Sequence, residues 1–155
     1  MGIEAGQAAP EFALDSTTGR TISLKDLRGK KVVLYFYPKD DTPGCTREAC
    51  NFRDAFADFE KSNAVILGVS PDDVSSHHDF KKKFNLPFPL LADPDHKIAD
   101  AYGVWKEKTN YGKSYMGIER TTFVIDTHGQ VATVFPKVKV DEHQVEVLKA
   151  VEAAG

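Results

Sequence analysis

The chain has 155 residues, which suits one domain with one hydrophobic core, and we expect a single domain over residues 1–155. Hydrophobic residues make up 41% and charged residues 28%, values typical of globular proteins and not of disordered or fibrous ones. The formal net charge of −3 argues against a nucleic-acid partner, and no apolar stretch reaches the ~18 residues of a membrane span, so we expect a cytoplasmic protein without a membrane partner.

The first third of the chain predicts a hairpin, a strand and a helix. Residues 12–22, interrupted by the turn sequence Ser-Thr-Thr-Gly, predict an extra N-terminal β-hairpin at the sheet edge. Residues 31–37 (KVVLYFY) are β-branched and aromatic almost throughout, which predicts a strand buried on both faces and closed by Pro38. A helix packed on the sheet should follow, because apolar residues recur at helical spacing: Cys45, Ala49, Phe52, Phe56 and Phe59.

The rest of the chain continues this alternation of strands and helices. Residues 64–70 (AVILGVS) repeat the buried-strand pattern, and residues 71–73 offer the start of a helix that ends at Leu86-Pro87. The later predicted elements are a short helix at 96–102, strands at 121–126 and 131–135 joined by a turn, and a closing helix at 141–153. This order predicts the α/β class, with a central mixed β-sheet flanked by helices as in the thioredoxin-like fold.

Both cysteines of the chain lie in the segment 40–50 (DDTPGCTREAC). Thr42 can cap a helix that begins at Pro43, since proline at the first helical position loses no hydrogen bond. Cys45 then lies in the first turn, where unpaired N–H groups and the helix dipole favour a thiolate. A free cysteine is often only a small, inert core residue. Such a residue has no need of a cap, a proline and a glycine before it, so we predict that Cys45 is a thiolate at neutral pH.

Cys50 follows Cys45 by five positions. On an α-helix this separation means a rise of ~7.5 Å and a rotation of ~140°, which places the two Cα atoms about 8.6 Å apart. A disulfide requires roughly 4.4–6.8 Å between Cα atoms. Either the two sulfurs never pair, or the helix unwinds. We hypothesise a nucleophile and a resolving thiol that are linked by local unfolding of the first helical turns.

A peroxide is a fitting substrate for such a thiolate. Attack on a peroxide oxygen gives a sulfenic acid and expels hydroxide or alkoxide, so the site must stabilise negative charge on the leaving oxygen. Thr42, the N–H groups of Gly44 and Cys45, and a distant arginine are candidates. Arg120 stands directly before the strand 121–126 and can reach the sulfur from a neighbouring strand end, although a surface position is the alternative. Glu48 can orient that arginine, but we favour a position on the helix surface.

The same residues form a known motif. Pro38, Thr42 and Cys45 match the P-x-x-x-T-x-x-C motif of peroxiredoxins. The run 35–50 (YFYPKDDTPGCTREAC) resembles the bacterioferritin comigratory protein, or Q-type, subfamily, and the similarity extends along almost the whole chain, including 117–126 (GIERTTFVID). The resemblance implies a thioredoxin-like fold and thiol-dependent reduction of hydrogen peroxide and organic hydroperoxides.

The resemblance also implies a role for each site residue. Cys45 would be the peroxidatic cysteine, Thr42 and Arg120 its activating partners, Pro38 the shield of the pocket, and Cys50 the resolving cysteine. The disulfide of this subfamily is commonly intramolecular and is reduced by thioredoxin, and many members are monomers. We therefore expect a monomer that uses a peroxide as substrate and thioredoxin or a similar dithiol as reductant.

No cofactor is expected, because the chain has no nucleotide-binding pattern, and no metal is expected, because its histidines lack ligand spacing. Two alternatives stay open. A general thiol-disulfide oxidoreductase is disfavoured, because the C-x-x-C spacing of thioredoxin is replaced here by C-x-x-x-x-C. A non-catalytic redox sensor would oxidise slowly and would not turn over.

Overall fold

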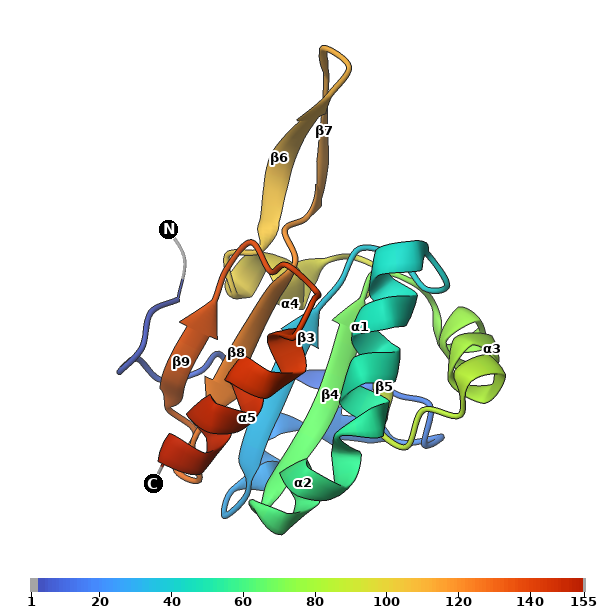
Figure 1. The fold of residues 1–155 in the computed structure, drawn as a ribbon. Coiled ribbons are helices and arrows are strands. Elements are labelled where there is room, and N and C mark those ends of the chain that lie inside the picture. The colour runs from blue at the N-terminus through green and yellow to red at the C-terminus, as the bar shows by residue number, and fades with distance from the viewer. Residues whose placement is uncertain (1–2, 155) are drawn as a thin grey trace.

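The computed structural model describes residues 3–154 and contains a central five-stranded sheet in the order β5-β4-β3-β8-β9 (Figure 1). The strands are β3 (Lys31–Phe36), β4 (Ala64–Ser70), β5 (Leu90–Ala92), β8 (Thr121–Ile125) and β9 (Val131–Phe135). β3, β4 and β5 run parallel to one another, whereas β8 runs antiparallel to both β3 and β9. The predicted mixed sheet is confirmed.

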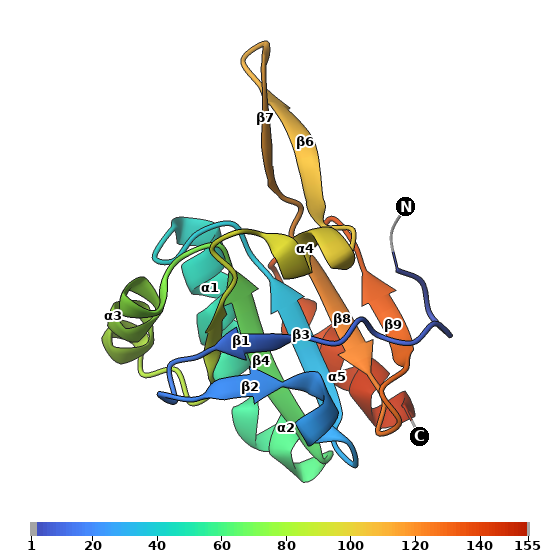
Figure 2. The same cartoon turned by 180° about the vertical axis from the view of Figure 1, so that it is seen from behind.

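Helices cover the front of the sheet, and a mixed layer covers the back. The front and side carry α1 (Pro43–Asp54), α2 (Phe56–Lys61), α3 (Val74–Phe84) and α5 (His143–Ala153) (Figure 1). The back carries β1 (Ala13–Asp15), β2 (Thr21–Ser23), a 3-10 turn at Leu24–Leu27 and α4 (Lys97–Ala101) (Figure 2). None of the helices described between residues 3 and 154 is long and apolar enough to cross a membrane.

Strand β3 has an apolar face on each side because its residues alternate between two hydrophobic clusters. Val33 and Tyr35 belong to the front cluster under the helices, whereas Leu34 and Phe36 belong to the back cluster. The front cluster holds the later turns of α1 firmly, because the ring of Phe52 lies 5.0 Å from that of Tyr35. Truncation of such a buried phenylalanine costs about 3–5 kcal/mol. Among the first four residues of α1, by contrast, only Cys45 is buried.

Three features differ from the sequence-based expectation. The helix predicted through Phe59 breaks at Ala55 into α1 and α2. The N-terminal hairpin is present, but its strands form a separate sheet across the back (Figure 2). Its turn is bonded to the edge strand β5, where the N–H of Thr17 donates to the carbonyl of Leu90. A hairpin of β6 (Trp105–Asn110) and β7 (Lys113–Ile118), which the sequence did not predict, projects from the body (Figure 1).

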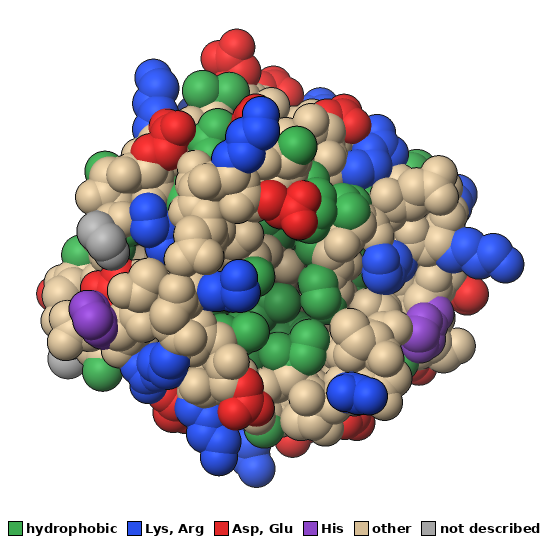
Figure 3. Space-filling model, turned by 90° about the horizontal axis from the view of Figure 1, so that it is seen from below, with side chains coloured by type: hydrophobic (Ala, Val, Ile, Leu, Met, Phe, Trp, Pro, Cys, Tyr) green, Lys and Arg blue, Asp and Glu red, His purple; other side chains and the backbone are tan. Residues whose placement is uncertain are grey.

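The end of the sheet opposite this hairpin carries a small cavity of about 180 Å³. Phe56, Val65, Pro87 and Phe88 contribute to its lining. Figure 3 looks onto this end and shows hydrophobic side chains gathered in a hollow among charged ones. The predicted site residues lie at the other end, where β3 leads into α1 (Figure 1).

Candidate active site

The loop from β3 to α1 places Cys45 at the start of a helix. Thr42 occupies the N-cap position in an extended conformation (φ −102°, ψ 155°), and Pro43 is the first helical residue. The N–H of Thr46 makes the first bond of the helix, to the carbonyl of Thr42 at 2.8 Å. The N–H groups of Gly44 and Cys45 therefore stand ahead of the helical ladder, at the positive end of the helix dipole.

The sulfur of Cys45 lies beside the guanidinium of Arg120. Nη2 of Arg120 donates to Sγ at 3.2 Å, and Nη1 donates to Oε1 of Glu48 at 2.7 Å. Cys45 and Glu48 are each only 1% exposed. Arg120 comes directly before β8, whose first residue pairs with Phe36 at the end of β3. Sheet pairing thus brings the arginine to the sulfur from a neighbouring strand end, in the position that the sequence predicts.

The charges of this cluster depend on one another. Burial works against the charge of Arg120, but Glu48 and Cys45 outweigh it, so the pKa of the guanidinium stands above its ordinary value. Burial raises the pKa of the Glu48 carboxyl from 4.5 to about 7, although the charge and the hydrogen bond of Arg120 both lower it. Glu48 therefore gains its negative charge near neutral pH, and its attraction for the guanidinium of Arg120 increases as it does so.

The surface position favoured for Glu48 from the sequence is wrong. Glu48 follows Cys45 by three positions and precedes Phe52 by four, so all three side chains share the buried face of α1. The apolar spacing already contained this signal, because the face that it predicts passes through position 48. Only the half-buried Arg120, a partner distant in the chain, makes a carboxylate acceptable there.

Gly44 makes room for the arginine. A β-carbon at position 44 would lie 3.2 Å from Nη2 of Arg120 and 3.9 Å from its Cζ. The first of these contacts is tighter than ordinary van der Waals separation, so any larger residue would displace the guanidinium that donates to the sulfur. The glycine before the cysteine is therefore explained by the close approach of Arg120.

Thr42 and Pro38 lie in the same loop as predicted, but the hydroxyl of Thr42 does not cap the helix. It donates instead to the carbonyl of Lys39 at 2.9 Å, because the side chain turns back toward the preceding loop. The hydroxyl oxygen keeps its lone pairs as acceptors. Pro38 is half-buried at the end of the strand region, directly after Tyr37.

Cys50 is half-buried in α1, and both cysteines are free thiols. The helix is continuous from Pro43 to Asp54, so the separation of about 8.6 Å between the two Cα atoms of an ideal helix applies here. The structure therefore corresponds to the reduced state, in which the two sulfurs cannot bond.

The chain is similar over almost its whole length to known proteins. The model of the AhpC/TSA family matches residues 5–134. A putative peroxiredoxin bcp of Coxiella burnetii is 56% identical over 148 residues, covering 96% of this chain and 98% of the relative. Peroxiredoxin Bcp of Bacillus subtilis is 54% identical over 152 residues, covering 98% and 97%. The chain is a peroxiredoxin of the AhpC/TSA family.

Solved structures of peroxiredoxins agree with this result. One is of the bacterioferritin comigratory protein of Xanthomonas campestris, whose description concerns alkyl peroxide reduction and trapped intermediate and ligand complexes. It matches with a TM-score of 0.91 and 42% identity, covering 97% of this chain and 98% of that one. The thioredoxin-like fold is confirmed, and the protein is a thiol-dependent peroxidase.

We expect Glu48 to make the stability of this peroxiredoxin fall as the pH rises from about 4.5 to about 7. In that window the folded carboxyl holds a proton that an unfolded glutamate has already lost, so the folded state binds more protons. The stabilisation by Glu48 is fully present at pH values below the pKa of the unfolded glutamate. It is lost as the pH rises through the pKa of the folded carboxyl. Integrated over the shift from 4.5 to about 7, it amounts to at most roughly 3 kcal/mol.

Urea unfolding of the wild type and Glu48→Gln at several pH values measures this effect. Glutamine cannot titrate, so the difference in free energy of unfolding between the two proteins should change by up to roughly 3 kcal/mol across the window. Glu60→Gln, which changes an exposed glutamate of α2, is the matched control. If wild type and Glu48→Gln show parallel pH profiles, the raised pKa of Glu48 is wrong.

Proposed function

We propose that Cys45 is the peroxidatic cysteine of this peroxidase and that Arg120 and the start of α1 activate it. The observation that carries the proposal is the hydrogen bond from Nη2 of Arg120 to the sulfur, 3.2 Å long, at the N-terminus of a helix. A guanidinium on the sulfur and the positive end of the helix dipole beside it favour the thiolate, which is the nucleophilic form. In the same loop, the hydroxyl oxygen of Thr42 serves as a hydrogen-bond acceptor, and Pro38 shields the pocket.

In the first step the thiolate attacks one oxygen of the peroxide. The S–O bond forms, the O–O bond breaks, and Cys45 becomes a sulfenic acid while hydroxide or alkoxide leaves and takes up a proton. Complete ionisation raises the thiolate fraction at pH 7 by only ~30-fold over an ordinary thiol. Fixed donors must therefore do more than ionise the sulfur. Arg120 and the N–H groups of Gly44 and Cys45 also stabilise the charge that develops on the oxygens.

In the second step Cys50 resolves the sulfenic acid. Its thiolate attacks the sulfur of Cys45, the S–S bond forms, and the sulfenic oxygen leaves as hydroxide that is protonated to water. The first turns of α1 must unwind for this. The contacts favour such an opening, because the later turns are anchored by Phe52, whereas Cys45 is the sole buried residue of the first turn.

Thioredoxin or a similar dithiol is the proposed reductant of the disulfide, and a monomer in the cytoplasm is the proposed working form. An intramolecular disulfide leaves thiol-disulfide exchange as the simplest way back to the reduced enzyme. A monomer suffices, because Cys45, Cys50, Glu48 and Arg120 all come from one chain. A reducing compartment suits a protein whose two cysteines are free.

The test is steady-state turnover with purified components. Wild-type enzyme is mixed with hydrogen peroxide or cumene hydroperoxide, thioredoxin, thioredoxin reductase and NADPH, and we expect one NADPH to be oxidised for each peroxide consumed. Insulin reduction without peroxide consumption would instead favour a general thiol-disulfide oxidoreductase. Oxidation of the protein once, without turnover by any dithiol, would favour a redox sensor.

A further inference from the structure

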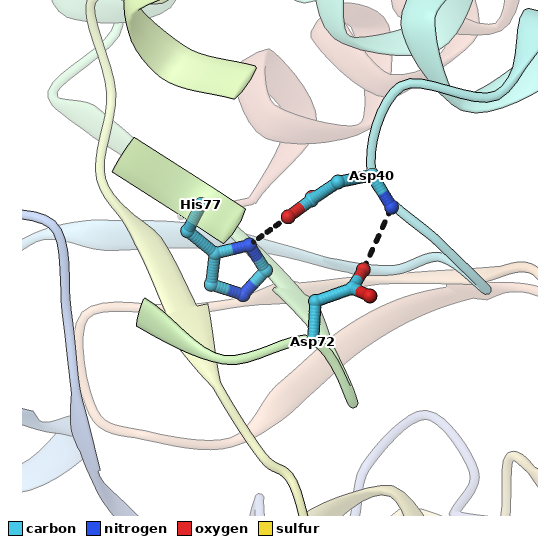
Figure 4. Close-up of side chains that lie close together, drawn as sticks. All are labelled: Asp40, Asp72 and His77. Atoms are coloured by element: carbon cyan, nitrogen blue, oxygen red, sulfur yellow. Dashed lines mark hydrogen bonds and ion pairs between the residues drawn. The ribbon is translucent and has the colours of Figure 1, made fainter. Parts of the chain in front are cut away.

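The loop between β3 and α1 is held in place by a largely buried network of side chains that does not include Cys45. Asp40, 7% exposed, stands at its centre and accepts three hydrogen bonds. The donors are Tyr37 Oη at 2.6 Å, Ser76 Oγ at 2.8 Å and His77, whose Nδ1 lies 2.6 Å from the carboxylate (Figure 4). Ser76 and His77 belong to α3, so this helix holds the loop in place.

Three more bonds extend the network to the sheet. The N–H of Asp40 donates to Oδ2 of Asp72 at 2.7 Å (Figure 4). Ser70 at the end of β4 donates to the same oxygen at 2.8 Å. Nε2 of His77 lies 2.8 Å from the carbonyl of Leu91 in β5. His77 is fully buried and spans the gap between β5 and the loop.

Both ring nitrogens of His77 make hydrogen bonds. A backbone carbonyl can only accept, so Nε2 carries a hydrogen, and the hydrogen between Nδ1 and Asp40 is shared by that pair. Ligand atoms of Asp40, Asp72 and His77 all lie within 4.8 Å of one another, which the spacing of histidines in the sequence did not indicate. Their hydrogen bonds account for this grouping without a metal.

The network reaches the reacting cysteine through the chain. Asp40 lies two residues after Pro38 and two before Thr42, and Asp41 between them has a left-handed backbone (φ 56°) that neighbouring contacts must maintain. The exposed ion pair of Asp41 with Lys83, at 2.7 Å, is too solvated to do this alone. The buried contacts of Asp40 therefore fix where α1 begins.

We propose that His77 is a positioning residue for the peroxide step, because it holds the loop 38–42 against α3 and β5 and so keeps the start of α1 aligned with Arg120. The proposal rests on the proposed role of Cys45. The loop keeps these bonds while the first turns of α1 unwind, so His77 governs the reaction with peroxide and leaves the disulfide step unchanged.

Two substitutions separate the two bonds of His77. The amide nitrogen of asparagine falls near the position of Nδ1 and that of glutamine near the position of Nε2. His77→Asn thus keeps a donor for Asp40 and loses the one for Leu91, whereas His77→Gln does the reverse. His78→Gln, on the exposed neighbour in α3, is the matched control.

Stopped-flow or quenched-flow mixing with hydrogen peroxide gives the rate of Cys45 oxidation and the rate of disulfide formation separately. Urea unfolding gives the stability of each variant.

We expect His77→Gln to slow Cys45 oxidation by tenfold or more, and His77→Asn to restore it to within about threefold of wild type, with disulfide formation unchanged in both. Equal oxidation rates in the two variants, or rates that follow their stabilities, would overturn the proposal.

If His77→Gln does not fold, Tyr37→Phe/Ser76→Ala removes two of the three donors to Asp40 and leaves His77 in place. That double variant should also be tenfold slower, and a wild-type rate in it would overturn the proposal. Absence of Cys45 oxidation in the wild type itself would instead contradict the proposed function.

Discussion

Cys45→Ser is expected to abolish peroxide reduction, whereas Cys50→Ser should still consume one equivalent of peroxide and then stop. The serine hydroxyl does not ionise near neutral pH, so neither Arg120 nor the helix start can turn it into a nucleophile. The Cys50→Ser protein keeps the cluster of Cys45, Arg120 and Glu48 and should accumulate the sulfenic acid. Rapid mixing with reduced protein, followed by trapping with dimedone and mass spectrometry, measures both outcomes.

These two variants also separate the roles of the sulfurs in turnover. With thioredoxin, its reductase and NADPH, Cys50→Ser should stall after the first equivalent, because no intramolecular disulfide forms. Undiminished peroxide reduction by Cys45→Ser would refute the assignment of the nucleophile. Full thioredoxin-dependent turnover of Cys50→Ser would leave Cys45 in place but remove Cys50 from the mechanism.

Arg120→Lys is expected to lower the rate constant of the reaction with peroxide by about 10²–10³, the loss typical of one transition-state donor. A lysine ammonium is a compact charge without the planar fork of arginine, so it cannot donate in the same geometry to both the sulfur and Glu48. Arg47→Lys, at a 59% exposed position of α1, is the matched control. A rate within threefold of wild type for a folded Arg120→Lys would show that a positive charge alone suffices. The simultaneous bonds of the guanidinium to the sulfur and to Glu48 would then contribute little to the rate.

The sequence predicts the sheet and the nucleophile because both signals are local. β3 is apolar at every position after Lys31, since both of its faces are covered, and this pattern is visible in the residues themselves. The N-terminus of α1 is equally local, because Thr42 and Pro43 directly precede Cys45. Arg120 can be named as a candidate because it stands directly before a buried strand. Only the pairing of β8 with β3, however, brings its guanidinium to the sulfur.

The features that the sequence does not predict depend on partners far apart in the chain. β6 and β7 show no alternation of apolar and polar residues, because most of their side chains are exposed and no core selects a face. The network around Asp40 joins residues from the loop before α1, the end of β4 and helix α3. Glu48 fits a buried face only because Arg120 meets it there. Each of these requires the tertiary fold before its role can be seen.

The reaction proposed for Cys45 and Cys50 requires the first turns of α1 to open between the two chemical steps. Hydrogen-deuterium exchange of residues 42–52, compared by mass spectrometry between reduced and peroxide-oxidised protein, tests this directly. We predict that the oxidised protein loses amide protection in this segment and keeps it in β3, because the sulfurs of an intact helix are too far apart to bond. Identical protection of the segment in an oxidised protein shown to carry the disulfide between Cys45 and Cys50 would contradict the mechanism.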